Sequence, residues 1–163
     1  MRATVSNAFL AALLAACLAP FAACDGGDDD GGAGGRGQVL DAASAACVER
    51  INGLRATIDL PPLERWTEAE ACADDQARQD SESGTAHGAF QQCDEYAQNE
   101  CPGWPSYDDV VQGCLQMMWD EGPGEPYSEH GHYINMTNTG YSEVACGFYT
   151  TPDGDVWAVQ DFR

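Results

Sequence analysis

Six cysteines are spread over the chain between residues 47 and 146, downstream of an apolar N-terminus that is typical of an export signal. They are Cys47, Cys72, Cys93, Cys101, Cys114 and Cys146. Exported proteins fold in an oxidising compartment, where an even set of cysteines forms disulfides. The spacing contains no Cys-x-x-Cys pair, which disfavours a zinc ribbon or knuckle. We therefore predict three disulfides between distant elements, and a short loop closed by Cys93 and Cys101 as the one pairing that the spacing favours.

The predicted export signal spans residues 1–23. Arg2 supplies its positive end, and residues 8–16 form an apolar run that is too short to span a bilayer. Cys17 and Cys24 each close a segment that resembles the lipobox of bacterial lipoproteins. Cys24 is the better candidate for lipidation, because it lies where the apolar stretch ends and because its choice leaves an even set of cysteines. We predict a cell-envelope lipoprotein anchored at Cys24, with simple secretion as the alternative.

The next two segments differ sharply in composition. Residues 24–38, rich in glycine and aspartate, are predicted to be a flexible acidic tether, and residues 39–163 to be the folded domain. The chain has a formal net charge of −20 and contains no lysine. This balance excludes nucleic acid as a partner, because phosphates are bound by basic side chains. We expect contact with a membrane only through the lipid anchor, and a monomer in solution.

Three helices are predicted in the first part of the domain. Apolar residues recur at three- and four-residue spacing over residues 39–58, which indicates the first helix. The second is expected over residues 67–81, opened by a capping box that starts at Thr67. The third is expected over residues 107–120, with Ser106 as its start signal.

The last part of the domain has a different pattern. Residues 143–149 and 155–162 are aromatic and β-branched runs, separated by the turn sequence Thr-Pro-Asp-Gly at residues 151–154. This arrangement predicts a β-hairpin. Helices that precede strands in this way indicate an α+β fold, in which helices cover an antiparallel sheet.

Several short stretches of the domain carry motifs in a definite order. They are Arg50–Arg55, Pro62–Trp66, His87–Gly88, Met118–Glu121, Gly131–Met136 and Tyr141–Gly147. Together they resemble the bacterial branch of the CAP superfamily, which includes cysteine-rich secretory proteins, venom allergens and plant pathogenesis-related proteins. The resemblance covers residues 39–163. It implies an α-β-α sandwich in which helices flank an antiparallel sheet.

In the CAP superfamily, two histidines and two glutamates line a central cleft. The resemblance places His87, Glu121 and His132 of this chain there. Two imidazoles and a carboxylate suit zinc or another divalent cation, with coordination positions left open for water or a ligand. These three residues are therefore the candidate metal ligands.

The fourth cleft position departs from the family pattern. Many members have a glutamate where this chain has Gln98, so an ionisable carboxylate is replaced by a neutral amide. Glu100 follows two residues later, but its Cα would lie about 6–7 Å further along an extended segment. Tyr133 and Asn135, on either side of Ile134 in the Gly-His motif, complete the candidate cleft residues.

The resemblance implies a binding module, since CAP domains are mostly known to bind lipids, sterols, peptides or receptors. We expect the cleft to take a cation, a small ligand or lipid, or part of an extracellular protein. One alternative is a metal-dependent hydrolase that uses the same cleft with Glu100 as its base. Catalysis is disfavoured because the obvious base is replaced by Gln98. A further alternative is a structural surface protein with a vestigial cleft.

Overall fold

The computed structural model describes residues 37–163. The predicted signal over residues 1–23, the proposed lipidation site Cys24 and the tether up to residue 36 lie outside the described residues. Within residues 37–163, no helix is both long enough and apolar enough to cross a membrane.

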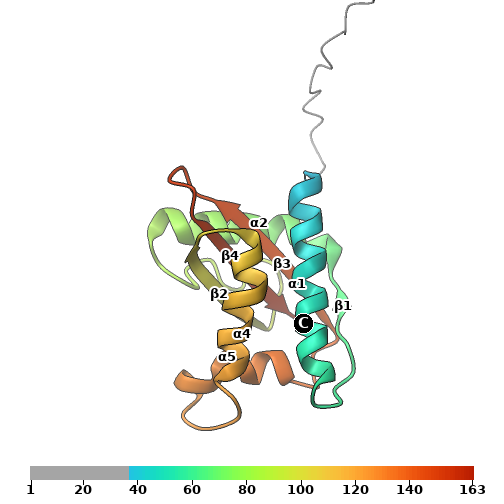
Figure 1. The fold of residues 1–163 in the computed structure, drawn as a ribbon. Coiled ribbons are helices and arrows are strands. Elements are labelled where there is room, and N and C mark those ends of the chain that lie inside the picture. Colours follow the sequence, from blue (N-terminus) through green and yellow to red (C-terminus); the bar gives the residue numbers. More distant parts are fainter. Residues whose placement is uncertain (1–36) are drawn as a thin grey trace, which may run out of the picture. The chain divides into compact units, whose positions relative to one another are not determined.

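The described residues form one sheet with helices on both faces, which confirms the α-β-α sandwich (Figure 1). In chain order the elements are α1 (Gln38–Ala56), β1 (Glu64–Arg65), α2 (Thr67–Ser83), β2 (Ala97–Trp104), α3 (Tyr107–Asp109), a π-helical turn η1 (Val110–Cys114), α4 (Leu115–Asp120), α5 (Tyr127–Thr137), β3 (Glu143–Thr150) and β4 (Val156–Phe162). The strand order is β1-β3-β4-β2, with β1 parallel to β3 and the other neighbours antiparallel. Helix α2 covers one face, and α1, α4 and α5 lie on the other.

The two central strands alternate their side chains between two apolar layers. On the face toward α2, Ala145 packs with Trp66 and Ala69, and Val159 packs with alanines of that helix. On the opposite face lies the main core. It contains Cys47, Ile51 and Leu54 of α1 together with Val144, Cys146 and Phe148 of β3. The three- and four-residue spacing in α1 therefore does bury one helix face, as predicted.

The predicted hairpin is also confirmed. Strands β3 and β4 pair antiparallel around the turn at residues 151–154, and Gly154 there has the left-handed φ of 97°. Three further elements were not predicted from the sequence. They are the short edge strand β1, the other edge strand β2, and helix α5, which includes the Gly-His motif.

All six domain cysteines form disulfides, but the predicted bridge between Cys93 and Cys101 is wrong. Cys93 pairs with Cys72, Cys101 pairs with Cys114, and Cys47 pairs with Cys146. The sheet explains the error. Cys101 on β2 points into the main core beside Cys114, whereas Cys93 lies under α2 on the opposite face. Nearness along the chain is therefore no guide to disulfide pairing when the two cysteines lie on opposite faces of a sheet.

The helix starts agree with the sequence in one case and not in another. The Oγ of Ser106 accepts a hydrogen bond from the backbone N–H of Asp109 at 3.1 Å, so it caps the helical segment as predicted. The capping box predicted at Thr67 is wrong. Thr67 is the first helical residue, and the preceding Trp66 caps α2 without a side-chain hydrogen bond. Glu70, expected to complete the box, instead binds Arg65.

Gly147 lies where α2 approaches β3 most closely. A Cβ added there would stand 2.1 Å from the backbone carbonyl carbon of Ala73 and 2.4 Å from the backbone N of Asp74. The side chain of Asp74 accepts a hydrogen bond from the backbone N–H of Phe148 at 2.7 Å. The helix backbone is thus held directly against the strand, and this contact has no room for a side chain.

The arginines within residues 37–163 all bond to other groups of the domain. Arg50 bonds to Gln116, Arg55 to the carbonyls of Pro61, Met136 and Asn138, Arg65 to Asp41 and Glu70, Arg78 to Asp75 and Glu82, and Arg163 to Glu143. Arg55 is almost fully buried, and burial lowers its pKa. Its guanidinium ties α1 to the carbonyl end of α5.

Candidate functional site

The candidate site lies where α5 runs beside the edge strand β2. Asn99 on β2 fixes this arrangement: its Nδ2 donates to the carbonyl of His132 at 3.1 Å, and its Oδ1 accepts from Asn135 at 2.9 Å. Asn135 is 5% exposed and also accepts a hydrogen bond from the hydroxyl of Tyr127 at 3.2 Å. Asn135 therefore positions α5 on the sheet as well as lining the site.

His132 is oriented by a carboxylate at the end of α4. The Oε1 of Glu121 lies 2.5 Å from His132 Nδ1, and its Oε2 accepts the backbone N–H of His132 at 3.1 Å. An ionised carboxylate can only accept, so the proton is assigned to Nδ1 and the lone pair to Nε2. Glu121 thus faces the ring nitrogen opposite to the one that is free to bind a ligand.

His87 is oriented by the side-chain amide of Gln98. The Oε1 of Gln98 lies 3.0 Å from His87 Nδ1. The Nε2 of Gln98 donates to Asp161 at 2.9 Å and to Gln76 at 3.1 Å, which fixes the direction of the amide. The proton is therefore assigned to Nδ1 of His87 as well, and Nε2 carries the lone pair.

The loop that carries His87 is held in an unusual backbone conformation. His87 has a φ of 60°, in the left-handed region that favours glycine. Its backbone N–H donates to Glu100 Oε2 at 2.5 Å, and the backbone N–H of Ala89 donates to Asp80 at 2.8 Å. Glu100 lies on the same side of β2 as Gln98, and both reach this loop. Glu100, which the sequence analysis placed about 6–7 Å beyond the fourth cleft position, therefore does contact His87, through the His87 backbone N–H.

His87 and His132 line one small cavity of about 230 Å³, which we call the histidine cavity. Gln98, Tyr127 and Asn135 also line it. Within residues 37–163, neither imidazole makes a hydrogen bond through Nε2. The fold therefore brings the two predicted histidines together, each with the same nitrogen free.

Other predicted site residues lie around this cavity rather than in it. Glu121 and Glu100 line a larger adjoining cavity of about 750 Å³, which His132 also borders. Tyr133 packs its ring on Trp119, with centroids 4.9 Å apart. Their roles as metal ligand, base and cleft residue remain predictions.

The one compact group of candidate metal ligands found within residues 37–163 lies elsewhere, at Cys93, Glu95 and Asp161. The sulfur of Cys93 is bonded to Cys72, so it cannot act as a thiolate ligand. Glu95 already accepts hydrogen bonds from Gln76 and from the backbone. This group therefore lacks the free donors that a metal site requires.

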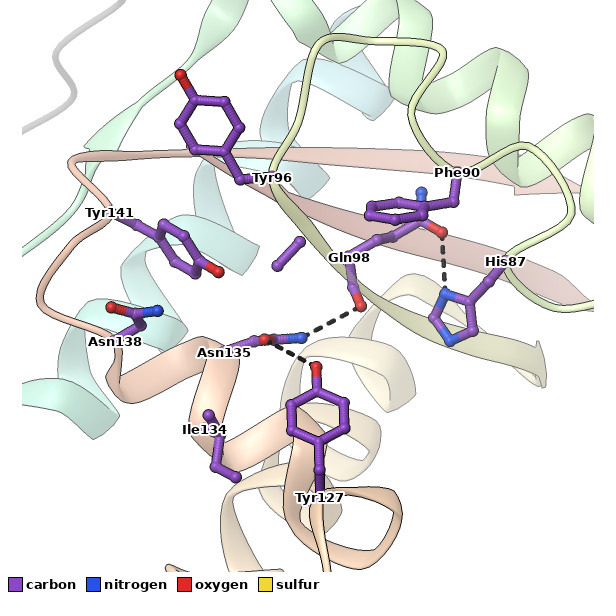
Figure 2. Close-up of a pocket in the computed structure, with 10 residues that line it drawn as sticks. His87, Phe90, Tyr96, Gln98, Tyr127, Ile134, Asn135, Asn138 and Tyr141 are labelled. Atoms are coloured by element: carbon purple, nitrogen blue, oxygen red, sulfur yellow. Dashed lines mark hydrogen bonds between the residues drawn. The ribbon is translucent and has the colours of Figure 1, made fainter.

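A wider pocket opens beside the histidine cavity (Figure 2). It has a volume of about 480 Å³ and shares His87, Gln98, Tyr127 and Asn135 with that cavity. Phe90, Tyr96 and Tyr141 add aromatic rings to its wall, and sequence reasoning did not find them. They come from three separate loops or strand ends, so no single motif connects them.

Three acidic side chains are buried under the His87 loop, between α2 and the sheet. They are Asp80, Glu100 and Asp161, and each has one carboxyl oxygen without a hydrogen-bond partner among the described residues. Loss of hydration on burial raises the pKa of Asp161 to about 8. Burial, reinforced by Asp80, raises the pKa of Glu100 to about 7. The environment thus favours the protonated form of these carboxyl groups.

Replacing Asp161 with asparagine is expected to stabilise the domain in mild alkali. The carboxyl group titrates near its ordinary pKa of 3.8 in the unfolded chain and at about 8 in the folded domain. The folded state therefore binds more protons between these values, and stability falls as the pH rises through that window. Asp161→Asn abolishes this titration and should gain about 1–3 kcal/mol at about pH 8.5, with little change at about pH 4.

Urea denaturation at both pH values measures this effect. Asp153→Asn is the matched control, because it removes the same charge from an exposed turn. Equal gains in the two variants at alkaline pH would assign the effect to net charge instead of to burial of Asp161.

Comparison with known proteins supplies an independent view of the chain. The sequence model described as CAP, Cysteine-rich secretory protein family, matches residues 48–162. No curated protein sequence matches the chain.

Several solved structures have similar folds. NaASP2, crystallised with Zn²⁺, aligns over 79% of this chain and 83% of its own, with a TM-score of 0.61 and 14% identity. Venom allergen-like protein 4 of Schistosoma mansoni covers 73% and 87%, with a TM-score of 0.51 and 14% identity. An outer surface protein of Borrelia burgdorferi covers 71% and 88%, with a TM-score of 0.51 and 19% identity. At these identities the likeness concerns the fold.

Proposed function

Because this chain belongs to the CAP family of cysteine-rich secretory proteins, we propose that it is an extracellular binding module that holds a zinc ion in the histidine cavity. The ligands would be Nε2 of His87 and Nε2 of His132. The observation that carries this proposal is the matched state of the two rings. In each ring Nδ1 faces an oxygen, from Gln98 in one case and Glu121 in the other, and with the proton assigned to Nδ1 both Nε2 lone pairs are free.

This pattern is the one that metal-binding histidines generally use. A hydrogen bond from the far ring nitrogen to a carboxylate or carbonyl oxygen fixes the tautomer and the ring orientation. Here Gln98 and Glu121 would orient the ligands without touching the metal. Two protein ligands would leave coordination positions for water or for a ligand atom, so a bound zinc would supply a Lewis-acidic anchoring point. The similar fold of NaASP2, crystallised with Zn²⁺, supports the choice of metal.

Isothermal titration calorimetry of the full-length protein with zinc chloride tests the proposal. We expect one zinc ion to bind, and His132→Ala or His87→Ala to abolish that binding because each removes one of two ligands. Glu121→Gln should weaken binding by about 10- to 100-fold, the usual cost of losing an outer hydrogen-bond partner.

His130→Ala is the matched control for this titration. His130 lies on the same helix, two residues before His132, but its Nδ1 faces the carbonyls of Glu121 and Gly122 at 2.8 and 2.9 Å. Zinc affinity should therefore be unchanged in this variant. A protein that binds no zinc, or that loses it equally in His130→Ala, would refute the assignment.

A metal-dependent hydrolase with Glu100 as its base is the competing function. Its support is that Glu100 borders the cavity shared with His132 and has a pKa raised to about 7. However, the Glu100 side chain is only 1% exposed, and one of its oxygens is bonded to the His87 backbone. A general base must reach the water that it activates. Assays of the zinc-loaded protein on peptide and ester panels should therefore show no turnover.

We further propose that the module is displayed on the cell envelope through a lipid on Cys24. The support is the predicted export signal, together with three disulfides that suit an oxidising compartment. Mass measurement of the mature N-terminus tests this step. A mature chain without acyl groups on Cys24 would show a secreted protein instead.

A further inference from the structure

The wide pocket beside the histidine cavity is walled by aromatic rings, and we call it the aromatic pocket. Its wall contains Phe90 from the loop after α2, Tyr96 from the approach to β2, Tyr127 from α5 and Tyr141 from the approach to β3. Figure 2 shows the rings of Phe90, Tyr127 and Tyr141 around a floor made by Gln98 and Asn135, with Tyr96 at the outer edge and its ring directed outward. Four separate segments thus deliver rings to one hollow.

Three of these four rings are exposed. Tyr96 is 68% exposed, Tyr127 55% and Phe90 37%. Aromatic side chains bury more apolar surface than most others, so the core normally takes them. Several rings left in water around one hollow mark a binding surface more often than chance. The aromatic pocket is therefore open for a ligand that offers flat apolar surface.

The polar groups of the aromatic pocket narrow the ligand class. Its lining contains the amides of Gln98, Asn135 and Asn138, phenol hydroxyls and one imidazole, but no Asp, Glu, Lys or Arg. Within residues 37–163, the hydroxyls of Tyr96 and Tyr141 and the Nδ2 of Asn138 make no hydrogen bond. The pocket therefore offers neutral donors and acceptors beside exposed rings.

We propose that the aromatic pocket binds a neutral oligosaccharide built from pyranose rings with equatorial hydroxyl groups. Such a ring has two faces of axial C–H groups and a rim of hydroxyls. The faces can pack on exposed aromatic rings, and the rim can exchange hydrogen bonds with the free hydroxyls of Tyr96 and Tyr141 and with the Nδ2 of Asn138. This ligand class therefore uses both the aromatic rings and the polar groups of the lining.

Other ligand classes use only part of the lining. An anion finds no Lys or Arg there and approaches a chain of net charge −20. A hydrocarbon chain would leave the free hydroxyls of Tyr96 and Tyr141 and the free Nδ2 of Asn138 without a partner. A quaternary ammonium ion would be attracted by the rings and by the negative charge, but it makes no use of the donors. It is the alternative that the experiment must separate.

Isothermal titration calorimetry on the full-length protein tests the proposal, with cellohexaose, xylohexaose and chitohexaose as probes and choline chloride as the competing ligand. At least one oligosaccharide should bind, and choline should not. Phe90→Ala and Tyr96→Ala should each weaken binding by about tenfold, since a stacking contact is lost. Tyr96→Phe should retain binding, because the ring remains. Met117→Ala is the control: it is also strongly exposed but lines a different cavity.

Saccharide binding in the aromatic pocket does not depend on zinc binding in the histidine cavity, so either proposal can fail without the other. Saccharide binding should persist in EDTA and in His132→Ala, because His132 does not line the aromatic pocket. Zinc binding should likewise persist in Tyr96→Ala. Binding of choline alone, binding of none of the oligosaccharides, or equal losses in Met117→Ala and Tyr96→Ala would overturn the proposal. Circular dichroism of the variants confirms that each is folded.

Discussion

A domain that lacks the Cys47–Cys146 disulfide is expected to lose about 4–5 kcal/mol of its free energy of unfolding. This bridge closes the longest loop of the three, with a sequence separation of 99 between its ends. A crosslink stabilises mainly by restricting the unfolded chain, and the restriction grows with loop length. Because small domains have only about 5–15 kcal/mol in total, the double variant Cys47→Ala/Cys146→Ala should be barely folded at physiological temperature.

The Cys101–Cys114 bridge provides the internal comparison. Its ends are 13 residues apart, so its removal should cost about 3 kcal/mol. Both bridges are buried in the same core, and each double variant removes two sulfur atoms from it. Urea denaturation of the two variants measures the difference. An equal or larger loss for the shorter loop would show that local packing, and not chain restriction, dominates.

Gly147→Ala is expected to destabilise the domain by about 3 kcal/mol, through overpacking at the contact between α2 and β3. The added Cβ would meet the backbone of Ala73 and Asp74, and neither can move as a flexible side chain could. Relief would require α2 to shift away from the sheet. That shift would weaken the hydrogen bond from Phe148 to Asp74 and the packing of Ala73.

The same substitution in α1 should have the opposite sign. Gly53 is helical, and a Cβ there meets nothing within 4 Å. Gly53→Ala should therefore stabilise the domain by about 0.5–1 kcal/mol, because alanine has the higher helix propensity. Thermal unfolding of both variants measures the pair. A loss at Gly53, or no loss at Gly147, would contradict this account of the two contacts.

The elements that could be predicted from the sequence are those with a regular apolar pattern. The apolar spacing in α1 and the apolar runs of β3 and β4 are visible in the sequence, because burial of one face of each element requires a regular apolar pattern. Strand β2 gives no such signal, since Gln98, Asn99 and Glu100 are polar yet buried. Helix α5 is interrupted in sequence by Gly131 and lacks a clear apolar stripe.

The candidate site could be predicted only in part, because several of its contacts join residues that are far apart in the sequence. The order of motifs was enough to bring His87 and His132 into consideration, and the fold places them on one cavity. The role of Gln98 could not be foreseen. Its amide direction depends on Asp161 of β4, which is 63 residues away in the chain. The aromatic pocket likewise depends on loops that meet only in the folded domain.

The internal pairing of the arginines also has a consequence outside the molecule. The chain has a net charge of −20, and each guanidinium within residues 37–163 is already bonded inside the domain, so no free arginine there can pair with the acidic surface of a second copy. Two copies that approach within the screening distance of about 8 Å at physiological salt will repel one another. Copies displayed densely on one surface would therefore space themselves apart, and the spacing would shrink as the salt concentration rises.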